Sequence, residues 1–199
     1  MQLNENDYNR LHAFYQEALE YYGPQSASAV HWTDRHNQEL RFSIIEPLIE
    51  NNSSVLDVGC GLGDLYVFLS RRGKSVQYVG IDIVPEFIEL ATQRFPNLTF
   101  KQTTVFDITQ HFDYVVASGA LSFKIENYQQ FYFDMIRRMF ELCTKGVAFN
   151  MLRHGNHVDD AEFATYAPEE VLAFCQTLTP HANLRTDYLE HDFTIILRK

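Results

Sequence analysis

The sequence has few cysteines and no long apolar run, and these absences exclude several classes of protein. Its three cysteines, Cys60, Cys143 and Cys175, are far apart and none has CxxC spacing, which excludes a disulfide framework and a zinc knuckle. No apolar run approaches the roughly 20 residues that span a bilayer. The first ten residues, MQLNENDYNR, are polar and acidic, unlike a secretory signal. We therefore expect a cytoplasmic protein with no membrane contact.

Basic residues are also scarce. The chain of 199 residues has 16 Lys and Arg against 26 Asp and Glu, giving a net charge of -10. Such a surface repels the phosphates of nucleic acids, so we expect no DNA partner. Internal repeats and Gly/Ser linkers are lacking too, which favours one domain. Within it, residues 1–50 are expected to form an N-terminal helical lid and residues 51–199 the core.

Strand and helix patterns alternate from residue 54 onward. Strands are expected at 55–58, 77–81, 98–103, 114–117 and 147–151, and helices at 64–72, 85–95, 127–143 and from 168. Such alternation requires crossover connections, and hence a mainly parallel, doubly wound sheet with helices on both faces. The last two strand patterns, 184–188 and 193–197, are joined by the short LEHD segment and predict a terminal antiparallel hairpin. The sequence therefore predicts an α/β fold with seven strands.

Three glycines follow the first expected strand, in the stretch VLDVGCGLGDLY. Gly59, Gly61 and Gly63 stand at alternate positions, where a backbone without Cβ atoms can turn tightly and let a ligand approach. A dinucleotide site would need its third glycine one residue later, where Asp64 stands. A carboxylate at a helix start repels a diphosphate. The spacing therefore favours a ligand with cationic groups and no phosphate.

This stretch resembles the first motif, (D/E)-x-G-x-G-x-G, of class I S-adenosylmethionine-dependent methyltransferases, with Asp57 as the opening acid. YVGIDIVPEFIELA is similar to the family's second motif, whose acid, here Asp82, accepts hydrogen bonds from both ribose hydroxyls. FDYVVASGALSF resembles the fourth motif. The resemblance covers roughly residues 55–199. It implies a Rossmann-like fold and S-adenosyl-L-methionine as the cofactor, with S-adenosyl-L-homocysteine as the product.

The resemblance also implies a set of cofactor-binding residues, with one departure from the family. The family's usual Gly-Asp after the third strand falls on Thr103 and Thr104, so either Asp107 or the backbone at Thr104 and Val105 would contact the adenine. An arginine of the lid, Arg41 in preference to Arg35, would pair with the cofactor carboxylate, and Cys60 would contribute its backbone N–H. The expected set is Arg41, Asp57, Gly59, Cys60, Gly61, Gly63, Asp82, Ile83, Thr104, Val105, Asp107 and Ser118.

The catalytic residues are not determined by the sequence. Many small-molecule relatives carry a Glu-His pair in the fourth motif, where this chain has Ser122 and Phe123. The loop HGNHVDD could supply a metal site, a histidine base or only solvated side chains, and the last reading is favoured, so no metal is expected. The remaining candidates for a base are His31, His154, His157 and Tyr166.

Aromatic residues make up 14% of the chain, and with a single domain they favour a small, partly apolar acceptor in an enclosed pocket. SGALSF lacks the prolines of the (N/D/S)-P-P-(Y/F) motif that stacks a flipped base, which again argues against DNA. The expected reaction is methyl transfer to a small molecule by in-line displacement. Alternatives are a protein or RNA acceptor, a non-catalytic S-adenosylmethionine-binding module, and a nicotinamide oxidoreductase, which Asp64 opposes.

Overall fold

A computed structural model describes residues 3–31, 34–155 and 162–199. Its centre is one sheet with the strand order β3-β2-β1-β4-β5-β8-β7, and β6 pairs with β5 beside this path. Strands β1 to β5 are parallel, whereas β8 runs antiparallel to both β5 and β7. The strands are β1 (Ser53–Val58), β2 (Val76–Asp82), β3 (Thr99–Gln102), β4 (Phe112–Ala117), β5 (Cys143–Arg153), β6 (Thr165–Tyr166), β7 (Ala182–Arg185) and β8 (Asp192–Arg198).

The predicted fold class is confirmed, with two differences in detail. The sheet has an eighth strand, β6, which consists of two residues paired with Leu152 and Arg153 of β5. The connection between β7 and β8 in the hairpin is longer than expected, because β7 ends at Arg185 instead of continuing to Tyr188. Just beyond that end, the Arg185 guanidinium pairs with Asp187 at 2.8 Å. The expectation that only the LEHD segment joins the two strands is therefore wrong. The segment between them has six residues.

Prolines stand at or near the boundaries of three helices. Pro85 and Pro168 stand in the first turns of their helices, where a missing N–H costs nothing. Pro47 follows the end of a helix, which stops at Ile45 and continues as a short 3-10 turn. The helices are α1 (Glu5–Tyr22), α2 (Arg35–Ile45), α3 (Asp64–Arg71), α4 (Pro85–Arg94), α5 (Tyr128–Leu142) and α6 (Pro168–Leu178), with 3-10 turns η1 (Ala27–Val30), η2 (Glu46–Leu48) and η3 (Val105–Asp107).

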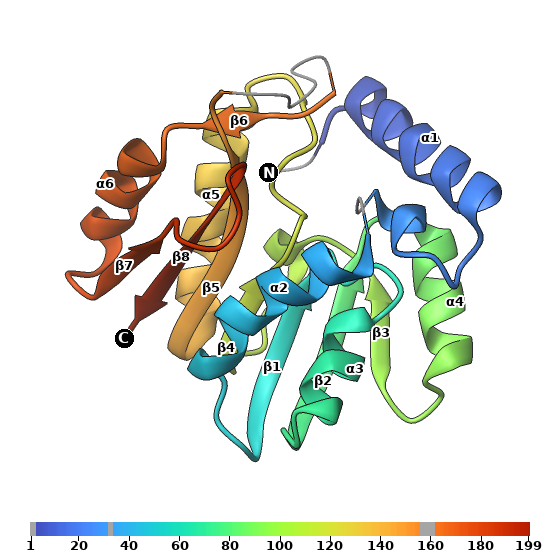
Figure 1. Cartoon of the computed structure of the whole chain (residues 1–199), viewed down its shortest axis with the longest axis horizontal. Coiled ribbons are helices and arrows are strands. Elements are labelled where there is room, and N and C mark those ends of the chain that lie inside the picture. Colours follow the sequence, from blue (N-terminus) through green and yellow to red (C-terminus); the bar gives the residue numbers. More distant parts are fainter. Residues whose placement is uncertain (1–2, 32–33, 156–161) are drawn as a thin grey trace.

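Helices cover both faces of the sheet (Figure 1). On one face, Phe42 of α2 and Phe68 of α3 belong to a core cluster with Tyr114 of β4. On the other face, side chains of α5 and α6 pack against the sheet in a larger cluster that includes Ile136 and Val171. Helix α4 lies beside α3, where Arg94 pairs with Asp64 at 2.8 Å. Within residues 3–31, 34–155 and 162–199, no helix combines the length and apolar character needed to cross a bilayer.

Helix α1 lies over the carboxyl ends of the strands (Figure 1). Two polar contacts hold it there: His12 Nε2 lies 2.9 Å from a carboxylate oxygen of Glu86 on α4, and Asp7 Oδ2 accepts a hydrogen bond of 2.9 Å from the backbone N–H of Glu126. Within the segment expected to form the lid, α1 therefore takes the covering position, whereas α2 belongs to the core. This arrangement places α1 above the site described next.

Candidate cofactor and acceptor site

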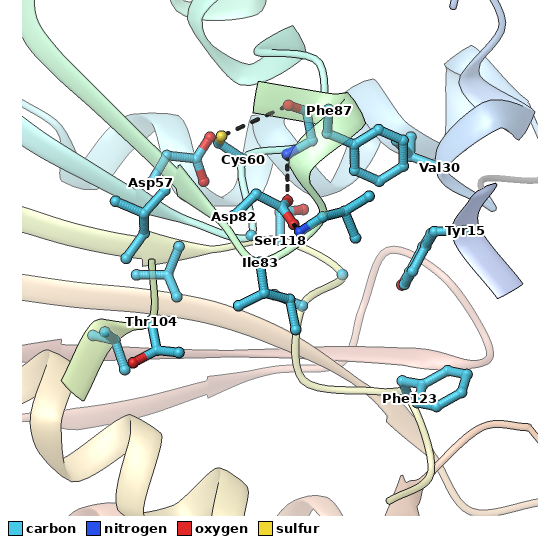
Figure 2. Close-up of a pocket in the computed structure, with 18 of the residues that line it drawn as sticks. Tyr15, Val30, Asp57, Cys60, Asp82, Ile83, Phe87, Thr104, Ser118 and Phe123 are labelled. Carbon is cyan, nitrogen blue, oxygen red and sulfur yellow. Dashed lines mark hydrogen bonds between the residues drawn. The ribbon is translucent and has the colours of Figure 1, made fainter. Parts of the chain in front are cut away.

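A cavity opens at the carboxyl ends of β1, β2 and β4, below α1 (Figure 2). From β1 the chain runs outward through β2 to β3 and then returns to β4 on the other side of β1, and open α/β sheets bind ligands at such reversals. Most of the expected cofactor-binding residues line this cavity. They are Asp57, Gly59, Cys60, Gly61, Asp82, Ile83, Thr104, Val105 and Ser118.

The loop after β1 is fastened to the end of β2. The backbone N–H groups of Gly59 and Cys60 donate to the carbonyl oxygen of Ile81, at 2.8 and 3.0 Å. The N–H of Gly61 donates to Asp82 Oδ2 at 2.9 Å. Cys60 lines the cavity, and its N–H is engaged by the Ile81 carbonyl oxygen in this structure. The loop presents a fixed surface at this edge of the cavity.

The glycines are required mainly by the protein's own packing. All three have positive φ angles, +71° at Gly59, +50° at Gly61 and +79° at Gly63. An added Cβ at Gly59 would lie 2.3 Å from Ala120 Cβ, and one at Gly63 would lie 3.0 Å from the Phe95 ring. Gly63 does not line the cavity. The expectation that a ligand's approach explains the third glycine is thus corrected: Gly63 allows α3 to start against an aromatic cluster.

Asp57 is a buried carboxylate at the end of β1. Its Oδ2 accepts a hydrogen bond of 2.5 Å from the Tyr78 hydroxyl. Burial raises the pKa of Asp57 to about 7, against the effect of the Tyr78 hydrogen bond, and the charges of Asp82 and Asp64 raise it further. A carboxylate in these surroundings gains strongly from a positive charge. Asp57 therefore fits a ligand that brings an ammonium or another cation.

Asp82 is held in place at the end of β2. Besides the N–H of Gly61, the N–H of Val84 donates to its carboxylate, at 3.0 Å to Oδ1. Burial raises the pKa of Asp82, while these backbone N–H groups oppose the rise. Because its two oxygens are oriented by backbone groups and line the cavity, Asp82 can accept further hydrogen bonds from neighbouring hydroxyls of a sugar.

The loop after β3 contributes Thr103, Thr104, Val105 and Phe106 to the cavity. The Thr104 hydroxyl donates to Asp107 Oδ2 at 2.6 Å, and Asp107 itself is not among the lining residues. Of the two alternatives for a purine contact, the structure thus brings Thr104 and Val105 to the cavity and leaves Asp107 outside it.

Gln38 of α2 also lines the cavity. Its side chain is buried; Nε2 donates to Asp64 Oδ2 at 3.4 Å, while Oε1 has no hydrogen-bond partner in the described part of the chain. A buried unpaired acceptor costs free energy, so Oε1 fits an N–H donor of a ligand. Asp64 also pairs with Arg94 at 2.8 Å, so its charge is partly offset.

The comparison with known families decides the class of this protein. A family model described as "Methyltransferase domain" matches residues 49–184, more than half of the chain. The chain belongs to this methyltransferase family. The sequence-based prediction of a class I S-adenosylmethionine-dependent methyltransferase is thereby confirmed.

Relatives and solved structures agree with this assignment. Rv1506c of Mycobacterium tuberculosis, a protein named as a methyltransferase, is 29% identical over 158 residues, which is 73% of this chain and 93% of that protein. The structure of the Burkholderia thailandensis 1,6-didemethyltoxoflavin-N1-methyltransferase, with 1,6-didemethyltoxoflavin and S-adenosylhomocysteine bound, has a TM-score of 0.69 at 16% identity, covering 100% of this chain and 91% of that one. The S-adenosylhomocysteine-bound magnesium protoporphyrin IX methyltransferase of Synechocystis has a TM-score of 0.65 at 13% identity, covering 82% and 83%. These two likenesses show a shared fold.

In this methyltransferase Arg41 does not reach the cavity. Its guanidinium forms an ion pair with the Asp192 carboxylate of β8, and both side chains are buried. Arg41 is absent from the cavity lining. The expectation that Arg41 binds the cofactor carboxylate is therefore corrected, because the carboxylate that it meets belongs to the protein itself. From the same helix, the side chain that lines the cavity is Gln38.

Three candidates for a general base, His31, His154 and Tyr166, lie outside the lining of the methyltransferase cavity. His31 stacks on Phe14 with ring centres 3.7 Å apart and hydrogen-bonds the Phe14 carbonyl oxygen at 3.0 Å. His154 Nδ1 lies 2.7 Å from the Thr165 hydroxyl. Tyr166 is buried, and none of His31, His154 and Tyr166 lines the cavity. The last candidate, His157, lies outside the described residues.

The loop after β4 completes the methyltransferase site. Asn150 of β5 donates from Nδ2 to the Ser118 hydroxyl oxygen at 2.9 Å and accepts, at Oδ1, the N–H of Gly119 at 2.9 Å. These contacts hold Ser118 and Gly119 at the cavity wall. Aromatic residues that the sequence did not assign to the site also line it, among them Tyr15, Phe87 and Phe123. The helical spacing of Leu11 and Tyr15 was the signal for a shared face of α1.

Proposed function

We propose that this chain transfers a methyl group from S-adenosylmethionine to a small-molecule acceptor. The charge of the cavity lining carries the proposal. Among the described residues, that lining includes the carboxylates Asp57, Asp64 and Asp82 and no Lys, Arg or His side chain. A diphosphate would be repelled there, whereas a ligand with a sulfonium and an ammonium group would be attracted. The charge pattern therefore favours the sulfonium cofactor over a dinucleotide.

Each end of the cofactor has suitable partners in this cavity. Asp82 would accept hydrogen bonds from the ribose hydroxyls. Asp57 and Gln38 Oε1 would accept hydrogen bonds from the ammonium group, directly or through water, which would resolve the unpaired state of Oε1. Thr104 and Val105 would lie beside the adenine. When bound, the cofactor supplies a methyl group on a positively charged sulfur, and these residues hold it so that an acceptor can approach in line.

A small acceptor is supported by the enclosure of the cavity. Helix α1 lies over the strand ends and contributes Leu11 and Tyr15 to the lining, so an acceptor would have to fit beneath it. The named acceptors of the two compared structures, a didemethyltoxoflavin and a magnesium protoporphyrin, are small molecules of those proteins. Cavities that enclose most of a ligand are typical of small-molecule sites.

Calorimetric titration tests the cofactor. We expect S-adenosylmethionine and S-adenosylhomocysteine to bind with micromolar affinity and NAD not to bind. Asp82→Ala should weaken both by about 10- to 150-fold, since a charged partner of two hydroxyls is lost. Asp187→Ala, which removes an exposed carboxylate paired with Arg185, is the matched control and should change nothing. Binding of NAD alone, or unchanged affinity in Asp82→Ala, would contradict the proposal.

The acceptor class is tested with S-adenosylmethionine that carries a labelled methyl group. The protein is incubated with a cell extract separated into small-molecule and macromolecular fractions, and we expect label to appear in the small-molecule fraction. Label in protein or RNA would replace the small acceptor with a macromolecular one. Tight cofactor binding without label in either fraction would instead indicate a non-catalytic binding module.

A further inference from the structure

One side of the cavity is lined by apolar and aromatic side chains. We call this part the aromatic half and define it by Leu11 and Tyr15 of α1, Phe87 of α4, Phe123 of the loop after β4 and Tyr132 of α5. Figure 2 shows Tyr15 and Phe123 on the side of the cavity away from Asp57 and Thr104. Lining of this kind favours a ligand with a large apolar face.

The Tyr15 ring is held by aromatic contacts on several edges. It makes edge-to-face contacts with Phe14, Phe87 and His31, with ring centres 5.4, 5.7 and 5.4 Å apart. His31 is itself fixed, because it stacks on Phe14 and hydrogen-bonds the carbonyl oxygen of that residue. His31 therefore supports the Tyr15 ring through this edge contact. A ring confined in this way keeps its hydroxyl in one position.

The Tyr15 hydroxyl is available to a ligand. Figure 2 shows it directed toward the space between Ile83 and Phe123, and it has no hydrogen-bond partner among residues 3–31, 34–155 and 162–199. The Tyr132 hydroxyl in the same half donates to the Phe123 carbonyl oxygen at 2.6 Å. Burial, and then the charge of Asp82, raise the pKa of Tyr15 above its usual range, so the hydroxyl remains a donor.

We propose that the aromatic half binds a flat, conjugated methyl acceptor whose carbonyl or ring-nitrogen lone pair accepts a hydrogen bond from the Tyr15 hydroxyl. The inference rests on the proposed function, because it requires the carboxylate-lined part of the cavity to hold the cofactor. Stacking against Phe87 and Phe123 would orient the plane of the acceptor, and the hydrogen bond would fix its rotation within that plane. Tyr15 is thus assigned as a residue that selects and positions the acceptor.

Two flat probes of similar size separate the hydrogen bond from apolar packing. Chromone carries a carbonyl acceptor, whereas naphthalene has none, and both are titrated into protein saturated with S-adenosylhomocysteine. In Tyr15→Phe we expect chromone to bind about three- to tenfold more weakly, the usual effect of one lost hydrogen bond, and naphthalene to change less than about twofold. Tyr21→Phe is the matched control, since Tyr21 lies on the same helix with 81% of its surface exposed.

Each other outcome overturns the inference in a recognisable way. Failure of both probes to bind the loaded wild type removes the flat acceptor, and equal losses for chromone and naphthalene reduce Tyr15 to a packing residue. If Tyr15→Phe weakens S-adenosylhomocysteine itself, Tyr15 belongs to the cofactor site. If the wild type does not bind S-adenosylhomocysteine at all, the proposed function fails, and the inference fails with it. The titration of the cofactor alone distinguishes this last case.

Discussion

Among single residues, Asp57 stands where burial and charge oppose its ionisation. It is buried at the end of β1, with the carboxylates of Asp64 and Asp82 close enough to raise its pKa. Tyr78 offsets part of this effect by donating a hydrogen bond. The unliganded protein therefore keeps a proton on Asp57 up to about pH 7, and binding of an ammonium group would favour its release. Cofactor affinity and proton release are coupled through this side chain.

We expect Asp57→Asn to change how stability depends on pH. The pKa of Asp57 is raised from 3.8 to about 7 in the folded protein, so the folded state binds more protons between these values. The stabilisation by the protonated form is complete below about pH 4 and is lost as pH rises through 7. Relative to Asp57→Asn, the wild type should lose about 2–4 kcal/mol between pH 4 and 8, measured by urea unfolding without cofactor.

Asp113→Asn is the control for this experiment. Its pKa is lowered in the folded protein, chiefly by the hydrogen bond from the Ser54 N–H. The Asp113 carboxylate therefore adds stability above its ordinary pKa, and this stability is not lost as pH rises from 5 to 8.

The affinity for S-adenosylhomocysteine should also depend on pH. The wild type should bind this ligand more tightly as pH rises from about 5.5 to 7.5, because Asp57 ionises in this range. A pH-independent affinity would separate Asp57 from the ammonium group.

The sequence predicted the position of a site residue best where that position depends only on the strand that the residue follows. Asp57 and Asp82 follow buried strands, and a parallel sheet brings such ends to one edge, so the sequence could place them at a site. Gln38 and Tyr15 were not assigned, because their positions depend on how α2 and α1 dock. That docking is decided by contacts between elements, which the sequence pattern of one helix does not contain.

At the scale of elements, Arg41 joins α2 to β8. Its buried pair with Asp192 links a helix near the start of the chain to its last strand. Burial raises the pKa of Asp192, and Arg41 opposes that rise. The sequence suggested a ligand role for Arg41 because no local pattern reveals a partner 151 positions away. Strand β6 was missed for a similar reason: its two residues are a strand only through pairing with β5.

Arg41→Ala should lower the free energy of unfolding by about 3–5 kcal/mol at pH 7, because it leaves Asp192 buried and unpaired. Arg71→Ala, which breaks an exposed pair with Glu39, should cost less than about 1 kcal/mol. Chemical unfolding measures both changes. Titration of the folded Arg41→Ala protein with S-adenosylhomocysteine should give the wild-type affinity within about twofold. A tenfold loss of affinity with unchanged stability would return Arg41 to the cofactor site.

At the scale of the whole molecule, cofactor binding should stabilise the entire fold. The cavity is bounded by residues of α1, α2 and α5 as well as by the ends of β1 and β2, so a bound ligand contacts elements from both faces of the sheet. Element order, parallel strands and the edge hairpin followed from alternating patterns and crossover rules. The exact closure of α1 over the strand ends did not, since it depends on contacts such as that of His12 with Glu86.

S-adenosylhomocysteine at about 100 times its dissociation constant should stabilise the protein by about 2.7 kcal/mol. For a chain of this length, the melting temperature should rise by about 5–10 °C, as measured by scanning calorimetry. At the same ligand concentration Asp82→Ala should show a clearly smaller rise. An equal rise in both proteins would mean that the ligand stabilises the fold from another site.

The position of β8 inside the sheet also has a consequence for biosynthesis. β8 lies between β5 and β7, yet it follows β5 in the chain only after residues 154–191 have been made. While the ribosome adds those residues, the nascent polypeptide carries β5 with an unpaired edge, and such edges invite pairing with other chains. Rapid translation of this stretch, or a chaperone bound to it, would therefore protect the yield of native enzyme.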